Sequence, residues 1–494
     1  MNATAPSPWA RWTVFLFLAL FGLALRLPQL GARPMHTDEA VNAYIVGRLL
    51  AGEAFTYDPI DRHGPALAAL ALPLSRIEGA KAFSDLTESD LRLASVLAGV
   101  VTILLFGAAI EMFGFTSCMV AALLFAGASL PVYYDRYFIH ESLFVAATFG
   151  LILTSWRACK RNSVAQAALA GACAALMLAC KETAVLNFFA LAAAASAFRF
   201  WNAREKVFGG LLRPKAALAA AITFILFGVL LFSWFGRNWK GLAALLQAVP
   251  DFLARASGEG HQKPFWYYAQ LLSGGWSGGL LLALACIGLF QTVKKRDPSP
   301  CGFLAYYAFF LAAIYSLIPY KTPWLALSLW LPISLLAARA VNSLWHKAVM
   351  HLPLHVAIPV FCTFGVLGAA LIAHDTRQRV YMHPADEANP YAYAHTSEDL
   401  LGLPAEIEEF ARRNAIQSPR IAVVAADPWP LPWYLRHFSQ VGFWQPGQQM
   451  GKADFYVTST EAAEQYADRL RNFRPDFFGL RPGVLILLWL PAPH

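Results

Sequence analysis

The sequence predicts a helical membrane protein with about eleven bilayer-spanning helices, followed by a small α/β domain outside the membrane. Hydrophobic residues make up 57% of the chain and charged residues only 14%, whereas about 25% of the residues of soluble domains are charged. Apolar runs close to the roughly 20 residues that cross a bilayer as a helix recur along the first three quarters of the chain. The predicted fold class is therefore a polytopic all-α membrane protein with one soluble domain at its end.

The apolar runs also predict the domain division. Residues 1–374 would form the membrane domain and residues 375–494 the soluble one. No small-residue cleavage site follows the first run, so it predicts an uncleaved anchor rather than a signal peptide. We place the spans by hydropathy at residues 12–30, 92–113, 117–134, 142–158, 164–180, 184–200, 216–236, 268–290, 302–318, 325–342 and 355–374.

The basic residues predict an orientation. Cytoplasmic loops are rich in Lys and Arg, and with the N-terminus inside, the basic loops 157–161, 199–215 and 294–296 all fall on the cytoplasmic side. The protein would then be integral to the cytoplasmic membrane, with an external or periplasmic C-terminal domain. Many of the basic residues behind the formal net charge of +8 lie in these loops, so the charge does not indicate nucleic-acid binding.

Cysteine usage excludes two other classes. The seven cysteines lie in or beside apolar spans and form no CxxC pair. We therefore expect neither a disulfide framework nor a zinc ribbon.

The first external loop, residues 31–91, is too long for a simple connector. Thr37 is a suitable N-cap for a helix that Gly52 would end. We expect this helix to lie along the membrane surface, because one face of it is apolar, formed by Ala40, Val41, Tyr44, Ile45 and Leu49.

The last 120 or so residues are predicted to hold a core of their own. Their periodicity predicts helices over residues 404–414 and 460–472, and strands over residues 421–425, 454–458 and 484–490.

Polar residues gather at the predicted external ends of the spans. Asp38 and Glu39 follow the first span, and charged turns recur at residues 133–141, 181–183, 237–238 with 258–268, and 319–324. Paired carboxylates can take a proton from an acceptor hydroxyl, and clustered cations can hold a phosphate leaving group. Together they favour transfer of a group from a lipid-linked phosphate.

Each of these features also has a purely structural interpretation. Asp38 and Glu39 could complement the positive end of the helix that follows them. Neighbouring charges, Asp135 with Arg136 and Lys181 with Glu182, could be local ion pairs. The histidines could be interfacial hydrogen-bonding residues, and their spacing fixes no metal site. The aromatics Trp266, Tyr267, Tyr268 and Trp324 could form an interface belt or stack on sugars. Lys321 is harder to explain structurally, since Pro319 and Pro323 rigidify a short turn around it.

An ordered set of short motifs resembles a known family. The set comprises His36-x-Asp38-Glu39-Ala40, His63-Gly64-Pro65, Arg136-Tyr137-x-x-His140-Glu141, Lys181-Glu182-Thr183, Pro319-Tyr320-Lys321-Thr322-Pro323-Trp324, Asn389-Pro390-Tyr391 and Trp429-Pro430-Leu431-Pro432-Trp433-Tyr434. The acidic pair is similar to the signature of GT-C glycosyltransferases related to the protein O-mannosyltransferases, glycosyltransferase family 39. The whole set is similar to a prokaryotic branch described as flippase-activity-associated membrane proteins.

This resemblance implies a GT-C hexosyltransferase with an external active site. The donor would be a polyprenyl-phosphate sugar, the acceptor a hydroxyl of a glycan, lipid or protein of the cell envelope, and the reaction inverting. Asp38 would be the general base and Glu39 would support it. Donor phosphate would bind to Arg136, Lys181 and Lys321, and the pocket would include His36, His63, His140, Glu141 and Tyr320. No metal ligands are assigned, and participation of a divalent metal is left open. The domain inserted in a central loop of the O-mannosyltransferases is lacking here, so acceptor identity does not carry over.

Two alternatives use the same residues differently. An accessory or carrier protein for flipping of lipid-linked oligosaccharides would need the cations but no base. An ion-coupled transporter would need ionisable residues deep within spans, and Glu111 lies near the end of one. In the C-terminal domain, Trp429, Trp433 and Tyr434 could stack on acceptor sugars, or residues 427–432 could form a packed turn.

Overall fold

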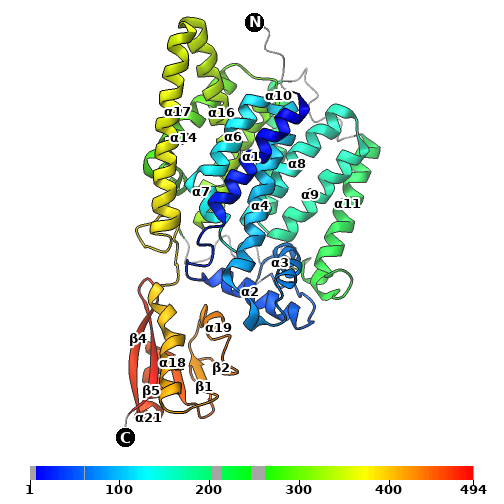
Figure 1. The fold of residues 1–494 in the computed structure, drawn as a ribbon. Coiled ribbons are helices and arrows are strands. Elements are labelled where there is room, and N and C mark those ends of the chain that lie inside the picture. The colour runs from blue at the N-terminus through cyan, green and yellow to red at the C-terminus, as the bar shows by residue number, and fades with distance from the viewer. Residues whose placement is uncertain (1–6, 60–61, 203–212, 246, 248–261, 493–494) are drawn as a thin grey trace. The chain divides into compact units, whose positions relative to one another are not determined.

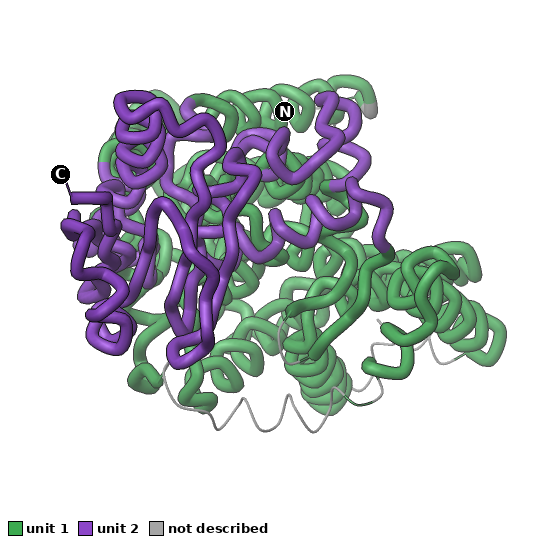
Figure 2. The backbone as a smooth tube through the Cα atoms, turned by 90° about the horizontal axis from the view of Figure 1, so that it is seen from below, with its two compact units in different colours: residues 1–28, 54–71, 92–382 green, residues 29–53, 72–91, 383–494 purple. Residues whose placement is uncertain are grey.

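A computed structural model describes residues 7–59, 62–202, 213–245, 247 and 262–492 of the chain. The chain divides into two compact units. Unit 1 comprises residues 1–28, 54–71 and 92–382, and unit 2 comprises residues 29–53, 72–91 and 383–494 (Figure 2). Segments of the predicted first external loop therefore fold with the C-terminal part.

Unit 1 is helical (Figure 1). Two of its helices, α3 and α4, extend into unit 2. Its elements are α1 (Pro8–Arg26), α3 (Ala66–Ile77), α4 (Glu88–Ala108), α5 (Ile110–Phe113), α6 (Phe115–Gly127), α7 (Ser129–Tyr134), α8 (Glu141–Arg161), α9 (Val164–Cys180), α10 (Ala184–Trp201), α11 (Pro214–Phe232), α13 (Tyr267–Ser273), α14 (Gly275–Lys294), α15 (Pro300–Leu317), η3 (Pro323–Leu325), α16 (Ala326–His351), α17 (Leu354–Thr376) and η4 (Arg377–Met382).

All eleven predicted spans are largely helical. Within the described residues, nine helices are long and apolar enough to cross a membrane. The predicted spans that fall short are 164–180, which is the 17-residue helix α9, and 117–134, which is divided between α6 and α7. Helices α8 and α16 are mostly enclosed by the rest of the unit, whereas α11 and α17 expose most of their apolar side chains. Such exposure is expected of helices that face lipid.

Proline explains why the span over residues 117–134 is interrupted. The ring of Pro131 would clash with the carbonyl of Gly127 in a continuous helix, and Ala128 is extended instead. The carbonyl oxygen of Gly127 accepts a hydrogen bond from the Thr376 hydroxyl at 2.8 Å. The predicted span over residues 268–290 is likewise divided, at the extended residue Gly274.

Unit 2 combines the helix α2 (Thr37–Leu50) with an α/β assembly. The other elements are η1 (Phe83–Asp85), η5 (Glu398–Leu401), α18 (Gly402–Arg413), β1 (Arg420–Val424), α19 (Leu431–Tyr434), β2 (Gln440–Trp444), β3 (Phe455–Ser459), α20 (Thr460–Gln465), α21 (Ala467–Leu470), β4 (Phe473–Arg481) and β5 (Val484–Pro491). The three predicted strands and the first predicted helix are confirmed. The second predicted helix is divided into α20 and α21 at Tyr466.

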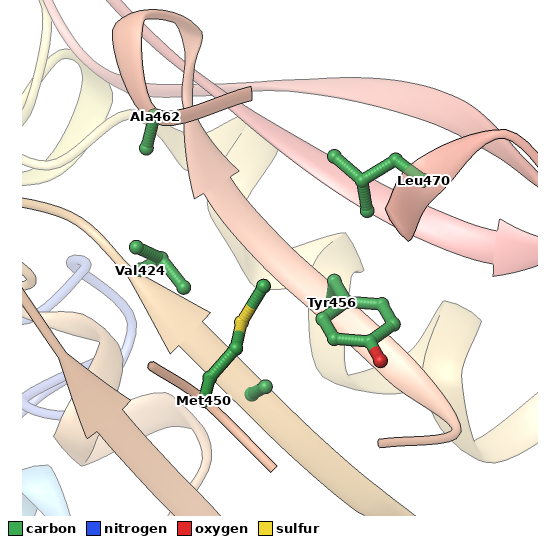
Figure 3. Packing of buried hydrophobic residues seen from close by; sticks show 6 residues of the cluster. Val424, Met450, Tyr456, Ala462 and Leu470 are labelled. Atoms are coloured by element: carbon green, nitrogen blue, oxygen red, sulfur yellow. The ribbon is translucent and has the colours of Figure 1, made fainter. Parts of the chain in front are cut away.

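The sheet has five strands in the order β2-β1-β3-β5-β4. Strand β1 pairs in parallel with β2 and β3, whereas β5 runs antiparallel to β3 and β4. Strands β2 and β4, the two edges, were not predicted. On one face of the sheet a core cluster forms around Val424, Met450 and Tyr456, and Ala462 and Leu470 cover it (Figure 3).

Candidate active site

The predicted acidic pair lies in the first turn of α2, in unit 2. The helix is capped by His36, whose Nδ1 accepts a hydrogen bond from the Asp38 N–H at 3.0 Å. The Glu39 carboxylate accepts from the His36 N–H at 3.1 Å, which completes a reciprocal capping box. The expectation that Thr37 caps the helix is wrong, because Thr37 is already its first residue.

The two carboxylates of the pair differ in their surroundings. Glu39 is fully buried and pairs with Arg33 at 3.6 Å, so its charge is used in holding the helix start. Asp38 is half-buried. Across the part of the chain that the structure describes, no side-chain hydrogen bond or ion pair occupies its carboxylate. Glu39 is therefore the carboxylate that complements the positive end of the helix. Asp38 is the carboxylate that is left available for chemistry.

His36 is fixed by its neighbours in unit 2. Its ring packs edge to face against His395, with the centroids 5.7 Å apart. Burial lowers the pKa of His36 despite the nearby carboxylates of Asp38 and Glu39. A neutral imidazole is what the cap requires, because only an unprotonated Nδ1 can accept the Asp38 N–H.

In unit 1, the buried cation Lys181 pairs with the buried carboxylate of Glu141. Lys181 is the C-cap residue that follows α9, and Glu141 begins α8. The alternative interpretation of Lys181 and Glu182 as a local ion pair is wrong, because the extended backbone at Lys181 and the helix that follows direct the two side chains to different partners.

Glu182 holds a histidine and a tyrosine. Its carboxylate bonds to His63 Nδ1 at 3.0 Å and accepts from the Tyr57 hydroxyl at 2.6 Å. Burial of Glu182 opposes ionisation, but the hydrogen bond and charge of His63 and the hydrogen bond of Tyr57 prevail and lower its pKa to about 2. Glu182 is therefore ionised, and it orients the His63 side chain, which is 43% exposed.

His140 connects the same group to the His63-Gly64-Pro65 motif. Its Nε2 bonds to the Gly64 carbonyl at 3.3 Å, and its ring lies edge to face against His63 at 5.3 Å. Burial, with the charges of His63 and Lys181, lowers the pKa of His140 well below its usual value. The predicted pocket residues His63, His140 and Glu141 therefore do gather around Lys181.

Arg136 does not pair with its neighbour Asp135, so the alternative interpretation of these two residues as a local ion pair is wrong. Asp135 is fully buried and binds Arg26 at 2.8 Å. Arg136 donates to the carbonyls of Arg26 at 2.8 Å and Pro28 at 2.5 Å, beyond the end of α1, and stacks on the Tyr381 ring at 5.0 Å. Part of its hydrogen-bonding capacity is thus committed to structure.

Lys321, the third predicted phosphate-binding cation, is a buried lysine whose ammonium group contacts backbone carbonyls. Its side chain is nearly completely buried, and Nζ donates only to the carbonyls of Lys263 and Ile318. Among the described residues no carboxylate lies within ion-pair distance of it. The half-buried Tyr320 beside it pairs with Gln262 in an isolated β-bridge. Residues 258–261 of this predicted polar loop lie outside the described residues.

The predicted acceptor-binding aromatics are mostly packed inside unit 2. Trp433 is fully buried, its indole N–H donates to Glu88 at 2.8 Å, and Arg436 covers its ring at 3.7 Å. Tyr434 is also buried. Trp433 and Tyr434 are therefore packed inside the unit, and Trp429 is the one of the three with a partly exposed ring.

No metal centre emerges from the residues that the structure describes. Among them, no three His, Cys, Asp or Glu side chains gather closely enough to hold an ion.

The fold and the residue groups can now be compared with known proteins. The profile of the dolichyl-phosphate-mannose-protein mannosyltransferase family matches residues 77–246. In solved structures the chain is similar to ArnT from Cupriavidus metallidurans bound to undecaprenyl phosphate, at 16% identity and a TM-score of 0.64, with 98% of each chain covered. The chain has the GT-C fold. No curated protein sequence matches it.

A second structural relative has the GT-C fold as well. The archaeal oligosaccharyltransferase AglB from Archaeoglobus fulgidus, in complex with an inhibitory peptide and a dolichol-phosphate, is 14% identical, with a TM-score of 0.53 over 98% of this chain and 76% of that one. The family resemblance inferred from the motifs is thus confirmed at the level of the GT-C fold.

Proposed function

We propose that the protein is an inverting glycosyltransferase that transfers a sugar from a polyprenyl-phosphate donor to an acceptor hydroxyl on the external side of the membrane. The observation that carries the proposal is the state of Asp38, a half-buried carboxylate with no side-chain partner among the described residues. The GT-C fold supports it, since the similar ArnT binds undecaprenyl phosphate and AglB binds a dolichol-phosphate.

In this mechanism Asp38 accepts the proton of the acceptor hydroxyl as its oxygen attacks the anomeric carbon. The new C–O bond forms while the bond from that carbon to the phosphate oxygen breaks. The electron pair leaves with the polyprenyl phosphate, whose negative charge rises from one to two. A general base of this kind contributes about 10²–10⁴-fold to the rate, and direct displacement inverts the anomeric centre.

Lys321 is the strongest candidate for the donor phosphate. Among the described residues, no carboxylate pairs with the buried Lys321 ammonium group. A buried cation without an anion is costly, and a bound phosphate would supply one. Lys181 already has Glu141 as partner. Arg136, like Lys321, donates to two backbone carbonyls, but it also stacks on the Tyr381 ring. We assign these two cations supporting roles at the phosphate, and His63, His140, Glu141 and Tyr320 the lining of the donor site.

Sugar transfer from a radiolabelled polyprenyl-phosphate hexose by purified protein in liposomes tests the proposal. We expect release of polyprenyl phosphate that depends on an added acceptor, drawn from a panel of glycans, lipids and peptides. Lys321→Met should weaken donor binding at least about tenfold, which corresponds to about 1.4 kcal/mol. Lys240→Met, at an exposed lysine, is the control for loss of one positive charge. Donor binding without turnover across the whole panel would contradict the transferase and favour a carrier for lipid-linked oligosaccharides.

A further inference from the structure

Two side chains from the C-terminal part of the chain form hydrogen bonds with the backbone just before the acidic pair. The Met35 N–H donates to the Tyr434 hydroxyl oxygen at 2.7 Å, and the Met35 carbonyl accepts from the Thr396 hydroxyl at 2.6 Å. Met35 is fully buried. Buried backbone groups need partners, and here side chains some 360 and 400 residues away supply them.

These hydrogen bonds to Met35 are connected to Asp38 through His36. Met35 precedes His36, whose Nδ1 holds the Asp38 N–H. The His36 ring in turn rests against His395, the residue before Thr396. Two sets of contacts therefore set the position of the Asp38 backbone. One is the pair of hydrogen bonds to Met35, and the other is the packing of His395 against His36. Residues from the C-terminal part of unit 2 make both.

Tyr434 is held in a fixed position by the packing of its own helix. Tyr434 is the last residue of α19 (Leu431–Tyr434). Its neighbour Trp433 is fully buried, hydrogen-bonded to Glu88 at 2.8 Å, and packs edge to face against Phe83 at 5.9 Å. A buried aromatic locked on both sides leaves the Tyr434 hydroxyl little freedom to move.

We propose that Tyr434 and Thr396 are positioning residues that hold the backbone leading to Asp38 in place, so that the C-terminal domain positions the general base. The structural part of this inference is independent of the reaction. Its consequence for catalysis rests on the proposed function.

The test compares Tyr434→Phe and Thr396→Val with the parent. Amide hydrogen exchange of residues 33–41 and the kcat and KM of transfer are measured on the same preparations. Removing one of these buried hydrogen bonds weakens the hold on the Met35 backbone, so exchange should accelerate about tenfold or more. Misplacing a catalytic group by about 1 Å costs up to 10²-fold in rate. We expect kcat to fall about tenfold or more, with KM for the donor nearly unchanged.

Two further variants separate positioning from general destabilisation. Thr396→Ser keeps the hydroxyl and should behave like the parent, even if Tyr434→Phe fails to fold. Tyr466→Phe removes a hydroxyl that donates to the Gln448 carbonyl at 2.8 Å elsewhere in unit 2, and it should leave exchange at residues 33–41 and kcat unchanged.

The outcomes distinguish this inference from the proposed function. Unchanged exchange at residues 33–41, or faster exchange with unchanged kcat, overturns the positioning role. An inactive parent with faster exchange in both variants overturns the proposed transferase. It leaves in place the inference that Tyr434 and Thr396 position the backbone leading to Asp38.

Discussion

The ammonium group of Lys181 pairs with the carboxylate of Glu141, which lies 40 residues earlier in the chain, and not with that of the adjacent Glu182. Both members of the pair are almost completely buried. In turn, Glu182 is free to hold His63 and Tyr57. The two carboxylates therefore divide the work, one compensating a cation and the other orienting an imidazole.

Glu141→Gln should strongly destabilise the protein. The change leaves the Lys181 ammonium buried without an anion, which costs about 3–5 kcal/mol. Thermal unfolding in detergent should show a clearly lower midpoint. Glu111→Gln is the matched control, since it breaks a half-exposed pair with Arg161 that is worth about 1 kcal/mol or less. Equal shifts in the two variants would show that burial of the Glu141 pair has no energetic consequence.

His140 should make the stability of the protein depend on acid pH. Its folded-state pKa lies well below 6.5, first because it is buried and then because of His63 and Lys181. The unfolded chain therefore binds more protons as the pH falls, so the stabilisation is complete above about pH 6.5 and is lost below it, by up to about 1.4 kcal/mol per pH unit for this one group. His140→Asn should flatten the decline of the unfolding midpoint between pH 6.5 and 5. An unaltered slope in the variant would rule out His140 as its source.

Gly64→Ala should displace the loop that carries His63. A Cβ at Gly64 would lie 2.2 Å from the carbonyl oxygen of Ala179, and the Gly64 N–H donates to the Cys180 carbonyl at 3.2 Å. The backbone contact cannot relax by a side-chain movement, so the loop must shift. We expect at least about tenfold weaker donor binding. Gly228→Ala, with open space around its Cβ, should bind donor like the parent, and similar binding by both variants would contradict the close packing at Gly64.

Trp433 and Trp429 should respond differently to alanine. Trp433→Ala removes a buried ring and should cost about 3–5 kcal/mol of stability, seen as a lower unfolding midpoint. Trp429→Ala, at a partly exposed ring, should lower stability much less. If acceptor sugars stack there, the Trp429 variant should raise the KM for a glycan acceptor. A raised acceptor KM in a fully stable Trp433→Ala protein would instead restore Trp433 as a sugar-stacking residue.

Much of the architecture could be predicted from the sequence, because membrane spans are recognised by the length and hydropathy of apolar runs. The prediction was less good where a local feature interrupts an apolar run, as Pro131 does between α6 and α7. Strand β4 was missed because it is an edge strand with charged residues and Pro475 in it, which removes the alternation that reveals a strand.

The sequence predicted which residues belong to the site better than it predicted which of them contact each other. The sequence indicated Asp135, Arg136, Lys181 and Glu182 as a polar set, and it offered pairing between sequence neighbours as one of two interpretations. The partners come from other helices, as Arg26 does for Asp135, and no local pattern encodes that. The contact between Met35 and Tyr434 spans 399 residues and could not be foreseen from periodicity or spacing.

The measurement that tests the account most directly is single-turnover sugar transfer by the parent and by Asp38→Asn, with donor binding measured on the same samples. Asparagine keeps the size of the side chain but cannot accept the proton, so transfer should fall by about 10²-fold or more while donor affinity stays within about twofold. Asp468→Asn, at a side chain that is 89% exposed, should transfer at the parental rate. Equal turnover by the parent and Asp38→Asn would contradict the central claim that Asp38 is the general base of a glycosyltransferase.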